Sequence, residues 1–152
     1  MLKKYFLLLL CLVTLLSSAL CLAEYDVQTH VVKFDKGKFS KIFNNAVIRG
    51  DREHYIFSAK AGQHLKVALS SVENNAEFQI YLPGYKILPK DEDGISSVSG
   101  NVFSKDNKIV ENNNEKASLT HLNTTLNISG DYLIEVGGTR GNADYKLEIA
   151  IQ

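Results

Sequence analysis

Few of the residues that could do chemistry stand in a catalytic or metal-binding pattern. No serine lies in a GxSxG nucleophile motif, because Ser99-Gly100 lacks the glycine two residues before the serine. The histidines lack the close spacing of a zinc site, and no HExxH is present. His54 and His64 each begin an expected strand, where an exposed polar residue is ordinary. We therefore expect no enzyme and no metal role for the four histidines, His30, His54, His64 and His121.

One acidic run is a candidate for calcium. Asp91, Glu92 and Asp93 precede Gly94, and hard cations prefer clustered carboxylates around a tight turn. The further ligands of a full calcium loop are missing, so a solvated acidic loop is the favoured interpretation. Asp91 and Asp93 remain weak metal candidates, and we expect no cofactor.

The most specific candidate is the connector GGTRGNA, which carries Arg140 at its midpoint. Gly137, Gly138 and Gly141 are expected to adopt positive φ and so push Arg140 into solvent. An ordinary polar turn is one interpretation. A binding loop is the other, because ordering a glycine-rich loop is costly unless a partner offsets that cost. A guanidinium suits a carboxylate, which it binds through two parallel hydrogen bonds.

The elements that would position this connector are short, mostly alternating segments. Residues Tyr145, Leu147, Ile149 and Ile151 share one face, so this last strand should be buried on one side. The last two strands should form an antiparallel hairpin through GGTRGNA, and the strands around Ala61-Gly62-Gln63 should form another. The expected strands are 27–34, 46–49, 54–60, 64–70, 77–82, 118–128, 132–136 and 145–151.

This pattern predicts an all-β protein, an antiparallel β-sandwich of about seven or eight strands with a jelly-roll-like arrangement. Residues from about 89 to 116 are polar and rich in Asp, Asn, Ser and Gly. They are expected to form a loop excursion with short strands at Val102-Phe103 and Ile109-Val110. The excursion has too few apolar residues for a core of its own, so residues 24–152 should form one domain.

The first 23 residues look like a cleaved signal peptide. Lys3 and Lys4 precede an apolar run, and Cys21-Leu22-Ala23 ends in small residues suited to cleavage. A retained membrane anchor is the alternative, because the run is nearly long enough to span a bilayer. Cleavage would remove both cysteines, which favours a bacterial periplasmic or secreted protein over a disulfide-rich animal module. It would leave 15 basic and 17 acidic residues, so we expect neither nucleic-acid binding nor, after cleavage, membrane binding.

Two stretches resemble a known group. GDREHYIFSAKAGQHLKVALSS resembles the core signature of bacterial pre-peptidase C-terminal-type β-sandwich domains, and SGDYLIEV with ADYKLEI resembles their final strands. Within that group the chain is most similar to periplasmic inhibitors of goose-type (g-type) lysozyme. The similar segments are FDKG at 34–37, IRG at 48–50, YxFxAKxGQ at 55–63, Ser129-Gly130 before Tyr132, and Thr139-Arg140.

The resemblance implies a small bacterial defence protein whose loop enters the cleft of a lysozyme and meets its catalytic carboxylates. Arg140 is the matching cleft-entering residue, and Ser129, Gly130 and Tyr132 match the motif beside it. Thr139 and Asn142 would shape the loop, and Tyr132 would brace it. The alternative is a non-inhibitory module of the same group that binds carbohydrate or other cell-envelope components, in which the acidic excursion matters more than the loop.

Overall fold

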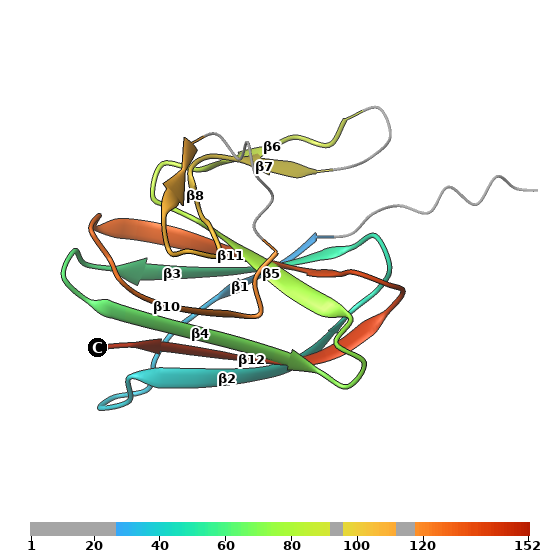
Figure 1. The fold of residues 1–152 in the computed structure, drawn as a ribbon, viewed down its shortest axis with the longest axis horizontal. Coiled ribbons are helices and arrows are strands. Elements are labelled where there is room, and N and C mark those ends of the chain that lie inside the picture. The colour runs from blue at the N-terminus through green and yellow to red at the C-terminus, as the bar shows by residue number, and fades with distance from the viewer. Residues whose placement is uncertain (1–26, 92–95, 112–117) are drawn as a thin grey trace, which may run out of the picture.

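A computed structural model describes residues 27–91, 96–111 and 118–152. Within these residues the chain is all β, and two main sheets pack face to face (Figure 1). This confirms the predicted sandwich. The expected signal peptide, residues 1–23, lies outside the described residues. The described part of the chain has no helix that is long and apolar enough to cross a membrane.

The first sheet has six strands in the order β1-β3-β11-β5-β8-β9. Its pairing is antiparallel except between β1 and β3, which run parallel. The strands are β1 (Val27–Val31), β3 (Arg52–Ala59), β11 (Gly130–Gly138), β5 (Ala76–Tyr81), β8 (Val102–Phe103) and β9 (Ile109–Val110).

The second sheet has four antiparallel strands in the order β10-β4-β12-β2. Strand β2 was predicted only at its end, because polar residues such as Asn44 and Asn45 interrupt its apolar pattern. The strands are β10 (His121–Thr125), β4 (His64–Ser71), β12 (Ala143–Ile151) and β2 (Ser40–Val47).

Both predicted hairpins are wrong. Strand β3 pairs with β1 and β11, whereas β4 pairs with β10 and β12 in the other sheet. Likewise β11 and β12 lie in opposite sheets, so the connectors at 60–63 and 139–142 cross between layers. Apolar and polar residues alternate in the same way whether two consecutive strands form a hairpin or lie in different sheets. In this structure the apolar faces of consecutive strands meet across the core instead of lying side by side in one sheet. The predicted one-sided burial of β12 is confirmed, with Tyr145, Leu147, Ile149 and Ile151 all inside.

The core between the sheets fixes the strands that carry the connectors. It is built from alternate residues of β3, β4, β5, β11 and β12, and the stacked rings of Phe57 and Tyr132 lie 5.4 Å apart. The inward residues of β3 and β11 include Tyr55, Phe57, Tyr132, Ile134 and Val136, each at most 1% exposed.

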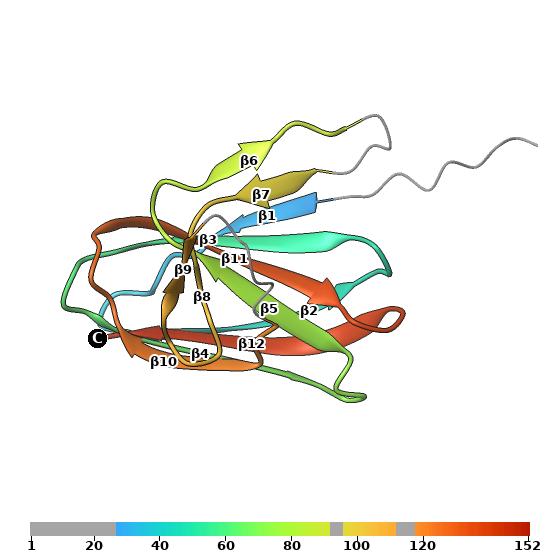
Figure 2. The ribbon, with the colours of Figure 1, turned by 45° about the horizontal axis from the view of Figure 1, so that its top comes forward.

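The predicted excursion forms a small addition to the sandwich. It contains β8 and β9 where they were expected. It also contains β7 (Ser97–Ser99), which pairs with β6 (Lys86–Leu88) just before the excursion; the sequence pattern did not indicate this pair. Val98 of β7 and Val102 of β8 pack with Tyr81 and Leu133 of the six-stranded sheet. Figure 2 shows the pair β6 and β7 beside that sheet. The excursion thus covers part of one sheet.

Candidate functional site

Three turns meet at one end of the sandwich. They join β2 to β3 (residues 48–51), β4 to β5 (72–75) and β11 to β12 (139–142). The strand registers place them together, since Gly137 pairs with Arg52, Gly138 with Ala76, and Ala143 with Val47. We call these three turns the tip, which lies at the right-hand end of the sandwich in Figures 1 and 2.

Asn75 holds the turn that carries Arg140. Its side chain is buried, and its amide nitrogen donates to the carbonyl oxygens of Asn142 at 2.7 Å and Arg140 at 3.5 Å. Its own carbonyl oxygen accepts from the Thr139 amide at 2.8 Å. A side-chain amide that replaces missing backbone partners in this way fixes a turn without secondary structure. The turn is therefore ordered within the chain itself, and its order does not depend on a partner.

The glycines of this connector have different roles from those expected. Of the three, only Gly141 has positive φ, at 72°. Gly138 is needed for space, because an added Cβ would lie 2.6 Å from the Gly141 carbonyl oxygen. Gly137 lies under the Arg52 guanidinium, whose nearest atom would be 3.1 Å from an added Cβ. The turn is thus compact and not loosely flexible.

The neighbouring turn contributes a second arginine. The backbone amide of Arg49 donates to Asn142 Oδ1 at 2.9 Å, which ties the turn at 48–51 to the turn at 139–142. The Arg49 side chain is exposed, beside Ile48 at 61% exposure. Arg49 is part of the family resemblance, but the sequence indicated no role for it, because its partner across the tip, Asn142, is 93 residues away.

The side chains that the tip presents to solvent include two arginines, two apolar residues and the acidic Glu73. Arg140 is exposed, and its Nη2 donates to a carbonyl oxygen, that of Glu73, at 3.4 Å. Val72, in the same turn as Glu73, is 94% exposed. Arginines together with exposed apolar side chains are typical of protein-binding surfaces, because arginine and contacts shielded from water contribute most of the binding energy at such interfaces.

The other predicted site residues lie at the far end of β11. Gly130 and Gly138 bound this strand, so they are about 27 Å apart at ~3.3 Å per residue. Tyr132 is fully buried, and its hydroxyl donates to the Ile128 carbonyl oxygen at 2.6 Å. Ser129 Oγ accepts from the Ala61 amide at 2.9 Å. The expectation that Tyr132 braces the Arg140 turn came from the family resemblance and is wrong, because Tyr132 lies near the start of β11 whereas Arg140 follows its end.

The structure therefore divides the predicted site into two groups. Thr139, Arg140 and Asn142 come together at the tip, where Asn142 bonds to both neighbouring turns. Ser129 and Gly130 shape the opposite end, and an added Cβ at Gly130 would lie 2.9 Å from Pro83.

Three of the four histidines, His30, His54 and His64, have structural partners. His30 Nε2 lies 2.6 Å from Glu53 Oε2, and His64 Nε2 lies 2.5 Å from Asn123 Oδ1. His54 was expected to be exposed but is buried, with Nε2 3.1 Å from Glu135 Oε2. Among the described residues, no three histidine, cysteine or acidic side chains are placed to hold a metal ion. Of the weak calcium candidates, Asp91 is described, whereas Asp93 lies outside the described residues.

A pair of tyrosines inside the sandwich is also structural. Their hydroxyl oxygens lie 2.7 Å apart, and burial raises the pKa of both Tyr55 and Tyr145 above that of free tyrosine. Both phenols therefore stay protonated at neutral pH, where neither supplies a base or a nucleophile.

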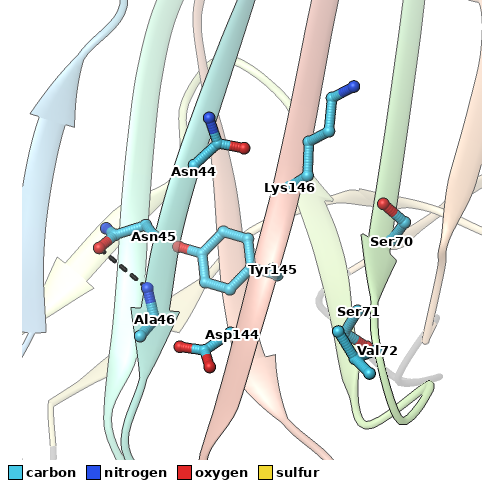
Figure 3. A pocket seen from close by; sticks show the side chains of 9 residues that line it. All are labelled: Asn44, Asn45, Ala46, Ser70, Ser71, Val72, Asp144, Tyr145 and Lys146. Carbon is cyan, nitrogen blue, oxygen red and sulfur yellow. Dashed lines mark hydrogen bonds between the residues drawn. The ribbon is translucent and has the colours of Figure 1, made fainter.

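A broad concavity of about 680 Å³ adjoins the tip on the outer face of the four-stranded sheet (Figure 3). The space is open because the side chains on β2 and β4 that line it are small. Asp144 and Lys146 of β12 lie along it. Val72 of the tip is at its rim. The concavity offers polar contacts beside the tip. Its lining residues are Asn44, Asn45, Ala46, Ser70, Ser71, Val72, Asp144, Tyr145 and Lys146.

Comparison with known proteins gives structural neighbours only. No protein-family model matches the chain. No curated protein sequence matches it either. The solved structure of PliG from Aeromonas hydrophila, a periplasmic inhibitor of g-type lysozyme, is similar with a TM-score of 0.58 and 26% identity, covering 84% of this chain and 98% of its own.

Two further solved inhibitors of g-type lysozyme have the same fold. PliG from Salmonella Typhimurium gives a TM-score of 0.55 at 24% identity, covering 82% of this chain and 98% of its own. A mutant of the Escherichia coli protein gives 0.52 at 23% identity, covering 84% and 100%. The chain thus has the sandwich fold of proteins described as periplasmic lysozyme inhibitors and not as enzymes.

Proposed function

We propose that this protein is a periplasmic or secreted inhibitor of lysozyme, most specifically of the g-type, that blocks the active-site cleft with its tip. The observation that carries the proposal is the tip itself, where one end of the sandwich exposes Arg49 and Arg140 together with Ile48 and Val72. The likeness to solved g-type inhibitors supports it.

The chemistry of the tip fits a muramidase cleft. A lysozyme cuts glycosidic bonds with carboxyl groups in a cleft, so its active site offers anions to a guanidinium. Arg140 would bind such a carboxylate, and the two parallel hydrogen bonds of that pair would fix its position. Ile48 and Val72 would exclude water around the pair, which strengthens it.

Pre-organisation explains how so small a surface could bind. Asn75 and Asn142 already order the turn in the free protein. Binding therefore loses less conformational entropy than it would with a mobile loop.

The second candidate is the carbohydrate-binding module, and the concavity on β2, β4 and β12 favours it. Amide, hydroxyl and charged groups line that space, as sugars require. The one aromatic residue in the lining, Tyr145, is buried and offers no exposed face for stacking on a sugar ring.

One experiment separates these functions. The form expected after signal cleavage, residues 24–152, is incubated with g-type, chicken-type and invertebrate-type lysozymes on bacterial cell walls. We expect slower lysis by the g-type enzyme. Failure to slow any of the three would refute the inhibitor proposal, and binding to purified cell-wall glycan without inhibition would support the module.

A further inference from the structure

The end of the sandwich opposite the tip carries a basic turn with exposed apolar side chains. This connector turn, residues 32–39, joins β1 to β2 and projects at the lower left of Figure 1. Lys33, Lys36 and Lys38 are all exposed. Phe39 at its end is 63% exposed, and Val31 just before it is 64% exposed.

The connector turn is held in place by the sandwich. The Lys38 amide donates to the Asp35 carbonyl oxygen at 2.9 Å, and Gly37 supplies the positive φ of 76°. The Phe39 carbonyl oxygen accepts from the Ile151 amide at 2.8 Å, so β12 fixes the base of the turn. An added Cβ at Gly37 would meet nothing within 4 Å, which shows that the turn extends into solvent.

Charge at this end is predominantly positive. The connector turn has three lysines against Asp35, and Lys60 is exposed in the adjacent turn between β3 and β4. Lys41 also belongs to this end, because its Nζ donates to the Lys33 carbonyl oxygen at 3.0 Å. Asp131 at this end is engaged by Ser58 Oγ at 2.5 Å.

We propose that the connector turn docks the protein on an anionic lipid surface. Lysines beside an exposed aromatic and an aliphatic side chain are the combination that binds the interface of an anionic membrane. Phe39 and Val31 would enter the boundary between headgroups and acyl chains, while the lysines contact lipid phosphates. This proposed peripheral contact differs from the expectation that the chain has no membrane partner after signal cleavage, and the vesicle test below decides between them.

The apolar residues favour a membrane over a soluble polyanion. A dissolved anionic polymer would use the lysines but would gain little from Val31, an aliphatic side chain with no ring to stack on a sugar. A lipid surface uses both kinds of side chain.

Docking at this end leaves the tip free. Strand β2 (Ser40–Val47) runs from the residue after Phe39 to the turn with Arg49, about 23 Å at ~3.3 Å per residue. A protein held by the connector turn would therefore present its tip away from the lipid.

The test is co-sedimentation of residues 24–152 with vesicles of phosphatidylglycerol or of phosphatidylcholine. We expect partition onto the anionic vesicles that weakens as salt is raised, and little onto the zwitterionic ones. Each lysine contributes about fivefold near an anionic surface, so Lys36→Glu with Lys38→Glu should weaken partition by about 25-fold or more. Phe39→Ser should weaken it several-fold without changing the charge.

The matched control is Lys105→Glu with Lys108→Glu. These two lysines are exposed in the turn between β8 and β9, at the sandwich edge opposite β1 and β2. The control pair should bind vesicles within about twofold of the unchanged protein. Equal loss in both pairs, no preference for anionic vesicles, or binding to a soluble anionic polysaccharide but not to vesicles would overturn the proposal.

The vesicle-binding proposal can be tested independently of lysozyme inhibition. All the variants leave the tip unchanged, so their inhibition of lysozyme in solution should equal that of the unchanged protein. Thermal unfolding followed by circular dichroism confirms that each variant is folded.

Discussion

Arg140 differs from an ordinary surface arginine because its backbone is fixed on both sides. Asn75 bonds to its carbonyl oxygen, and the Thr139 amide is bonded to Asn75 in turn. Among the described residues its guanidinium donates one hydrogen bond, at 3.4 Å to the Glu73 carbonyl oxygen, which a carboxylate could replace at little cost. An arginine fixed at its backbone but with a guanidinium available for binding is suited to a partner's anion.

Replacing Arg140 by alanine should weaken inhibition of g-type lysozyme tenfold or more, on the order of 1.4 kcal/mol, because the partner's carboxylate loses its counter-charge. Arg140→Lys should recover part of this loss, since the charge remains but the paired hydrogen bonds do not. The inhibition constant measures both.

Lys60→Ala is the control, because this exposed lysine lies at the opposite end. An inhibition constant unchanged in folded Arg140→Ala would remove Arg140 from the site.

At the scale of elements, the tip depends on contacts between turns that are distant in sequence. Asn75 in the β4–β5 turn and Asn142 in the β11–β12 turn together connect all three. Binding geometry should therefore respond to residues that never touch the partner.

Asn75→Ala tests this coupling. It removes two donated hydrogen bonds and leaves the carbonyl oxygens of Arg140 and Asn142 without that partner. We expect about 1–3 kcal/mol less stability in urea unfolding, together with weaker inhibition at temperatures where the variant is still folded.

The matched control is Asn107→Gly, because Asn107 lies outside the tip in the β8–β9 turn, is exposed and has a positive φ of 57° that glycine adopts easily. Its side-chain nitrogen also donates to a distant carbonyl oxygen, that of Asn123 at 3.2 Å. This variant should leave inhibition unchanged. Equal inhibition by Asn75→Ala and the unchanged protein would show that ordering of the turn does not matter for binding.

The sequence predicted the strands better than their partners. Alternation located β3, β4, β11 and β12 within a few residues, because one-sided burial leaves a period of two. It could not say that 60–63 and 139–142 cross between sheets, since either pairing buries the same faces. The link between Tyr132 and Arg140 came from the family resemblance and not from the alternation. The sequence also indicated no role for Asn75, whose partners are 65 and 67 residues away.

For the whole molecule, the two ends of the sandwich differ in chemistry. The tip has arginines with Ile48 and Val72, whereas the connector turn has lysines with Phe39 and Val31. The sheets between them form one core, so both ends are held in a fixed relation. Such a protein could engage a lysozyme at one end while the other contacts the envelope.

The central claim of the proposed function is that the tip occupies the lysozyme cleft. The direct measurement is binding of residues 24–152 to g-type lysozyme, with and without an N-acetylglucosamine oligosaccharide that fills the cleft. We expect binding whose apparent Kd rises linearly with oligosaccharide concentration, because the protein and the oligosaccharide compete for one site. An absence of binding, or binding that the oligosaccharide leaves unchanged, would contradict the claim.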